Sequence, residues 1–201
     1  MAVSSPVIRC WGRLEVRGAE LFAPGEPTLV VGNHDSYWDP IAIGIAAKKR
    51  RQIRALAKAS LWRIRPLAPI LNGMGQIPIE RAAGDQGALS TAIAHLRAGA
   101  CIGVFAEGTI SRGEQLRARS GVGRLAEAVP EAKIVCVAVR DTVSIVGFPA
   151  RPRITVEFFE PAGGGFAPGE DPGAFAGRLL GEIRVRAPVC AAGRGGRGAV
   201  G

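Results

Sequence analysis

Residues 28–47 read TLVVGNHDSYWDPIAIGIAA, and this stretch decides the fold class. It opens with an apolar, β-branched run at 28–32, which is typical of a buried strand. A polar turn follows, and Pro40 then stands where a helix can begin, because the first helical position needs no backbone N–H. The order of strand, polar turn and helix indicates an α/β unit, with the basic cluster 48–50 at the helix's C-terminal end.

The rest of the chain repeats this alternation. Strands are predicted at 28–32, 53–57, 76–79, 100–105, 133–139 and 153–159, and helices at 40–50, 60–70, 86–98, 121–128 and 175–186. We therefore predict an α/β fold: a single domain with a mixed, largely parallel sheet flanked by helices. The domain would span residues 1–186, and the Gly/Arg-rich tail 187–201 is predicted to be disordered.

The charge balance predicts a partner that carries phosphate. Twenty-six Lys and Arg against 17 Asp and Glu give a net charge of +9 and a pI near 10.4. Such a surface attracts phosphates, nucleic acid or an anionic membrane. Nucleic acid is disfavoured because aromatic residues make up only 5% of the chain and no nucleic-acid-binding module is recognisable.

Cysteine spacing and hydropathy define the expected compartment. The four cysteines form no pair or Cys/His cluster of metal-ligand spacing, so we expect no disulfide, no metal and a reducing, cytoplasmic location. No apolar run reaches the roughly 18 residues of a membrane span, and no signal peptide is visible. Segments 7–18 and 60–71 mix Arg with Trp and aliphatic residues, which suits either peripheral membrane attachment or the basic rim of a soluble domain.

Three polar clusters each follow a predicted strand directly. They are NHDSYWD (33–39), ER (80–81) and EGTISR (107–112). Ligands of open α/β sheets bind outside the carboxyl ends of the strands, so these clusters are expected to share one crevice.

Spacing alone leaves the role of the first cluster open. In a continuous helix His34 and Asp39 would lie about 140° apart and could not pair. With Pro40 as the first helical residue, 34–38 becomes a turn that could fold the imidazole back onto the carboxylate. The alternative is that Asp39 only caps the helix while His34 is a solvated turn residue.

The three clusters also resemble motifs of the lysophosphatidic acid acyltransferase family of glycerolipid acyltransferases. NHDSYWD is similar to its Asn-His-x4-Asp motif, GQIPIER (75–81) to its second motif, which ends in arginine, and FAEGTISR (105–112) to its Phe-Pro-Glu-Gly-Thr-Arg-Ser motif. IVCVAV (134–139) looks like the fourth, apolar motif. The likeness runs from about residue 14 to 160 with the motifs in order.

The resemblance implies a function and a set of site residues. A fatty acyl group would pass from acyl-CoA or acyl carrier protein to the free hydroxyl of lysophosphatidic acid, giving phosphatidic acid. His34 would be the general base, Asp39 would orient it, and no cofactor is implied. The residues implied to bind the acceptor are Ser36, Arg81, Glu107, Gly108 and Thr109. Lys58 falls where the family often has a lysine, although a surface lysine is an adequate alternative.

Two departures from the family pattern keep alternatives open. Ala106 replaces a proline, and Ile110 replaces an arginine that would contact phosphate, a role that Arg112 could take. The acceptor could therefore be another lysolipid or lipid hydroxyl. A non-catalytic phospholipid-binding protein on the same fold is the alternative from a different class. With only some thirty residues before the first motif, attachment is expected to be peripheral, on the inner face of an anionic membrane.

Overall fold

The computed structural model describes residues 13–79, 84–146 and 152–189. Its strands are β1 (Arg13–Arg17), β2 (Thr28–Gly32), β3 (Ile53–Lys58), β4 (Ile77–Ile79), β5 (Cys101–Phe105), β6 (Lys133–Arg140) and β7 (Arg153–Phe159). Its α-helices are α2 (Asp39–Ala47), α3 (Ala68–Gly73), α4 (Gly84–Arg97), α5 (Gly121–Ala128) and α6 (Pro172–Arg186). Short 3-10 helices, η2 (Ala19–Leu21), η3 (Ala59–Arg63) and η5 (Thr142–Val146), lie in the connections.

The strands form one mixed sheet with the order β1-β7-β6-β2-β5-β3-β4. The run from β6 to β4 is parallel throughout, while β7 pairs with β6 in the antiparallel sense and β1 is parallel to β7. The predicted fold class, a single domain with a mixed and largely parallel sheet flanked by helices, is confirmed.

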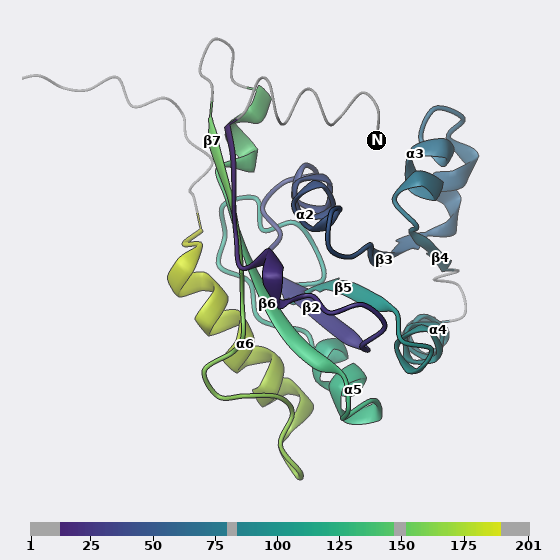
Figure 1. Ribbon diagram of the computed structural model, residues 1–201, viewed down its shortest axis with the longest axis vertical. Helices are drawn as coiled ribbons and strands as arrows, with labels where there is room; N and C mark the ends of the chain where they lie inside the picture. The colour runs from purple at the N-terminus through teal and green to yellow at the C-terminus, as the bar shows by residue number, and fades with distance from the viewer. Residues whose placement is uncertain (1–12, 80–83, 147–151, 190–201) are drawn as a thin grey trace, which may run out of the picture.

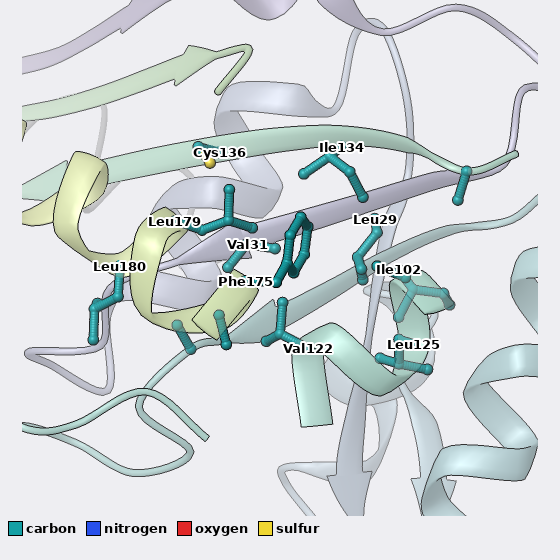
Figure 2. Close-up of a cluster of buried hydrophobic side chains, with 14 of the residues drawn as sticks. Leu29, Val31, Ile102, Val122, Leu125, Ile134, Cys136, Phe175, Leu179 and Leu180 are labelled. Carbon is teal, nitrogen blue, oxygen red and sulfur yellow. The ribbon is translucent and has the colours of Figure 1, made fainter. Parts of the chain in front are cut away.

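Each face of the sheet carries its own apolar core. Side chains alternate along a strand, so Leu29 and Val31 of β2 face one core while Val30 faces the other. Helix α2 covers the second core, whereas α4, α5 and α6 pack on the opposite face, as Figure 1 shows. In Figure 2 the ring of Phe175, from α6, lies among the side chains of Val31 and Val122.

The register of the central strands gathers the polar loops at one edge. Gly32, the last residue of β2, is level with Phe105 of β5 on one side and with Val137 of β6 on the other. A Cβ at Gly32 would lie 2.8 Å from Cγ1 of Val137, so glycine allows this close approach. The loops that follow β2, β5 and β6 therefore emerge side by side, as expected for the carboxyl ends of parallel strands.

Several elements differ from the sequence prediction. Strand β1 is absent from the sequence prediction. Its polar and apolar residues alternate over only five positions, as suits a short edge strand. The helix expected at 60–70 is divided into η3 and α3, with Pro66 between them.

Other differences concern where helices start, and α4 begins at Gly84, two residues before its predicted start. Helix α6 starts at Pro172, because Asp171 caps it by accepting from the backbone N–H of Ala174 at 2.8 Å. Helix α2 starts at Asp39 with Trp38 as its N-cap, so Asp39 is not the capping residue.

Candidate active site

The turn between β2 and α2 is anchored at its first residue. Asn33 is fully buried, and its side chain pairs with the backbone of Val139 in β6. The Asn33 amide donates to the carbonyl of Val139 at 2.9 Å and accepts from the N–H of the same residue at 2.8 Å. This two-point contact replaces the ladder hydrogen bonds that end with β2, and it fixes where the turn leaves the sheet.

Asp39 closes the turn from the other end with a fully buried carboxylate. Its Oδ2 atom accepts from the backbone N–H groups of Asp35 and Ser36, at 2.6 and 2.8 Å, and lies 3.2 Å from Nδ1 of His34. Its Oδ1 atom accepts from the hydroxyl of Thr142, a buried residue just after β6. One carboxylate thus both holds the turn and contacts the imidazole, although it does not cap the helix.

The His34 ring is held in place by contacts on several sides. It stacks on Phe105, with ring centroids 4.0 Å apart and an angle of 11° between the planes. The backbone of the same residue is also held: the backbone N–H of His34 donates to Oε2 of Glu107 at 3.0 Å, and its backbone carbonyl accepts from the N–H of Ser111 at 2.7 Å. The side chain is 16% exposed. Because Nδ1 faces Asp39, the other ring nitrogen, Nε2, is the one left for a substrate.

Glu107 and Asp35 are bound together by an arginine from the last helix. Arg184 of α6 donates to both oxygens of Asp35, at 2.8 and 2.9 Å, and to Oε1 of Glu107 at 2.6 Å. Asp35 also accepts from the side chains of Ser111 and Asn33. Glu107 is 1% exposed, and each of its oxygens has a protein donor, so its carboxylate contacts the turn after β2 from within the fold.

The ion pairs perturb two of these groups. Burial raises the pKa of Asp35, but the hydrogen bonds from Arg184, Ser111 and Asn33, together with the Arg184 charge, bring it below its ordinary value. Burial lowers the pKa of Arg184, but its hydrogen bonds to Asp35 and Glu107 and the charges of these two carboxylates raise it by more. The pKa of Arg184 therefore lies above its ordinary value. Asp35 and Arg184 are therefore a carboxylate and a guanidinium at neutral pH.

The remaining predicted site residues lie around this centre or outside the described residues. Ser36 is half-buried in the turn, and its hydroxyl accepts from the N–H of Trp38 at 3.2 Å. Gly108, with a φ of 71°, and Thr109 are exposed at the end of β5. Arg81 lies outside the described residues, as does the side chain of Lys58.

Several residues of the site were not predicted as site residues from the sequence, among them Asn33 as an anchor, Asp35, Thr142 and Arg184. Asn33 could have been found, since it begins the motif stretch and a polar residue directly after a buried strand needs partners. Thr142 and Arg184 carried no such signal, because their partners are 103 and 149 positions away along the chain.

Comparison with known proteins assigns the family. The family model described as Acyltransferase matches residues 13–140, which include every element from β1 to β6. The chain belongs to the acyltransferase family. The matched part of this acyltransferase-family chain holds His34, Asp39 and Glu107, whereas Thr142 and Arg184 lie beyond it.

A solved structure shares the fold. The crystal structure of the 1-acyl-sn-glycerophosphate (LPA) acyltransferase PlsC from Thermotoga maritima matches with a TM-score of 0.68 and 18% sequence identity. The match covers 92% of this chain and 75% of the Thermotoga chain. A search of curated proteins gave no match.

Two further observations concern metals and membranes. Within residues 13–79, 84–146 and 152–189, no three His, Cys, Asp or Glu side chains gather so that they could hold a metal ion. No helix in those residues is long and apolar enough to cross a bilayer.

Proposed function

We propose that this acyltransferase-family chain transfers a fatty acyl group from acyl-CoA or acyl carrier protein to the free hydroxyl of lysophosphatidic acid, giving phosphatidic acid. The observation that carries the proposal is the contact between Nδ1 of His34 and the buried carboxylate of Asp39, at 3.2 Å. It leaves Nε2 as the atom that takes the acceptor's proton.

The chemistry needs a base but no covalent nucleophile. A glycerol hydroxyl attacks the thioester carbonyl once Nε2 of His34 accepts its proton, and a positioned base typically contributes ~10²- to 10⁴-fold. The new ester C–O bond forms, the thioester C–S bond breaks, and the proton on the imidazolium passes to the leaving thiolate. Asp39 stabilises the imidazolium during this exchange and keeps Nδ1 protonated.

The protein offers an apolar surface for the acyl chain near His34. A pocket between α2 and the sheet is lined by Val30, Ile43 and Phe105, among others, and the Phe105 ring also stacks on His34. Apart from Gln76, the side chains that line this pocket are apolar. We propose that the acyl chain contacts these apolar side chains while the thioester carbonyl stays beside the imidazole.

Acceptor recognition is assigned to the loops at the strand ends. We propose that Arg81 binds the acceptor phosphate, since a guanidinium offers paired donors to phosphate oxygens. The exposed Gly108 and Thr109 would line the acceptor, with Ser36 on the opposite side. Glu107 would support the acceptor site indirectly, because its carboxylate already accepts from the backbone N–H of His34 and from Arg184.

A second acceptor class is motivated by one position. Ile110 stands where the family motif has an arginine, so one expected phosphate contact is absent from this loop. Another lysolipid, or a lipid hydroxyl without a phosphomonoester, is therefore the competing acceptor. A strict requirement for a phosphomonoester would decide for lysophosphatidic acid.

Membrane attachment would be peripheral and electrostatic. The end of η3 and the segment after it expose Arg63, Ile64 and Arg65, with Ile64 50% exposed, and the whole chain carries a net charge of +9. Basic and apolar side chains together suit an anionic lipid surface, which we propose to be the inner face of the membrane. Flotation with vesicles of anionic and of neutral lipid, at low and high salt, tests this proposal.

The decisive experiment is release of free CoA by the purified protein. Acyl-CoA and a panel of lysolipids are supplied to the wild type and to His34→Ala, with His95→Ala as the matched control. We expect release that depends on lysophosphatidic acid, is lost in His34→Ala and is unchanged in His95→Ala, since His95 lies on α4. Release that is independent of His34 would contradict the mechanism, and wild-type protein that consumes no thioester with any lysolipid would indicate a non-catalytic binding protein.

A further inference from the structure

Arg184 is the one side chain of α6 that forms ion pairs with both motif loops. It lies near the C-terminal end of the helix and holds Asp35, from the turn after β2, and Glu107, from the loop after β5. The side chains of the three residues are 9%, 13% and 0% exposed, respectively. The contact therefore joins three separate segments of the chain inside a largely desolvated cluster.

Both partners of Arg184 are attached directly to the base. Asp35 is the next residue after His34, and Glu107 accepts the backbone N–H of His34 at 3.0 Å. A movement of either carboxylate would therefore move the main chain of His34. Arg184 donates to both carboxylates, and Ser111 and Asn33 also donate to Asp35.

Charge makes the dependence strong. Asp39 contacts the imidazole of His34, Glu107 accepts from the backbone N–H of His34, and Asp35 is the next residue along the chain. Arg184 is the only guanidinium that the described residues place in contact with any of these three carboxylates. Two buried carboxylates left without their cation would have to acquire water, a proton or new donors. Water or new donors would reach the carboxylates only if the turn rearranged, and a proton would convert one acceptor oxygen of the turn into a donor.

We propose that Arg184 is a positioning residue: it fixes His34 by forming ion pairs with Asp35 and Glu107 at the same time. The inference rests on the proposed function, because it assigns a role within the same site. Arg184 touches no reacting atom in this role. Its loss lowers kcat and leaves KM for both substrates nearly unchanged, because the base is misplaced while the substrate surfaces remain.

The fold itself should tolerate the change. Helix α6 is held by a buried apolar face that includes Phe175, Leu179 and Ile183, all fully buried. Arg184→Met keeps most of the side-chain length and leaves this face intact. Arg178 supplies the matched control, since it lies on the same helix and forms an ion pair with Glu170 at 3.2 Å, away from both motif loops.

The test combines kinetics with a measurement that needs no substrate. For Arg184→Met we expect kcat for CoA release to fall roughly 10- to 100-fold, as misplacement of a catalytic group by about 1 Å does. Hydrogen exchange in the peptide spanning 33–39 should rise, and Arg178→Met should change neither quantity. Millimolar guanidinium should restore part of kcat in Arg184→Ala, while urea should not, because only the former replaces the missing fork.

The outcomes separate this inference from the proposed function. A folded Arg184→Met protein with wild-type kcat and wild-type exchange at 33–39 overturns the positioning role, whatever the substrate proves to be. If Arg184→Met does not fold, Arg184→Lys decides: its ammonium lacks the planar fork, so wild-type kcat and exchange in this variant overturn the two-point grip. Wild-type protein that releases no CoA overturns the proposed function, and the exchange measurement still tests the grip.

Discussion

Replacing Asp39 by asparagine removes one charge from the site and little else. The asparagine oxygen can take the place of Oδ2, which accepts from the backbone N–H groups of Asp35 and Ser36. The new NH2 group then faces the hydroxyl of Thr142, which can turn to accept. The turn can therefore keep its shape while the imidazolium of His34 loses its counter-charge.

The size of the effect follows from the contact that changes. When His34 takes up the acceptor's proton, its Nδ1–H faces an anionic oxygen at 3.2 Å in the wild type and a neutral one in Asp39→Asn. A hydrogen bond to a charged group contributes about 1.5–3 kcal/mol, which corresponds to roughly 10- to 150-fold in rate. We expect kcat to fall within this range and KM for both substrates to change by less than about threefold.

The assay is CoA release from acyl-CoA with lysophosphatidic acid, alongside thermal unfolding of each variant. Asp171→Asn is the control, because it makes the same chemical change at the N-cap of α6, where asparagine caps about as well as aspartate. We expect Asp171→Asn to keep wild-type kcat. A folded Asp39→Asn protein with wild-type kcat would refute the assignment of Asp39 as the partner of the base.

Three further predictions follow from buried groups. Thr142→Val should lower the free energy of unfolding by about 1–3 kcal/mol, because an oxygen of Asp39 loses its donor, and should reduce kcat by less than Asp39→Asn does. The folded pKa of Asp35 lies below its ordinary value, so its stabilising contribution is present above about pH 4 and is lost as pH falls through the folded value. Chemical denaturation at a series of pH values should therefore show the advantage of wild type over Asp35→Asn to be greatest near neutrality and to vanish in acid. Burial raises the pKa of Cys101 and of Cys136 to about 12, so neither should react with a thiol reagent at pH 8 in the folded protein. Both should react once it is denatured, as measured in a variant whose other two cysteines are serine.

Local sequence signals predicted every strand except β1, and they predicted that polar loops follow the strands at one edge of the sheet. The apolar runs of β2, β5 and β6 end at a glycine or at polar residues, and the loops after them hold His34 and Glu107. Because parallel strands end at a common edge, order along the chain was enough to bring these loops together.

The sequence could not predict the geometry of individual contacts, whether local or long-range. The turn angle that brings His34 to Asp39 depends on donors from the turn's own backbone, which spacing alone does not determine. The grip of Arg184 depends on the way α6 crosses the sheet, and this follows from packing of the apolar face of that helix. An arginine in the last turn of a helix is otherwise explained by the helix dipole alone.

The ion pairs of Arg184 also have a consequence for biosynthesis. The turn that carries His34 and Asp35 leaves the ribosome early, whereas Arg184 follows 149 positions after Asp35. Because domains emerge from the N-terminus first, the nascent chain completes the sheet segments around the base before it can complete their electrostatic partner. A chain interrupted before Arg184 would carry the motifs without the contact that joins their loops.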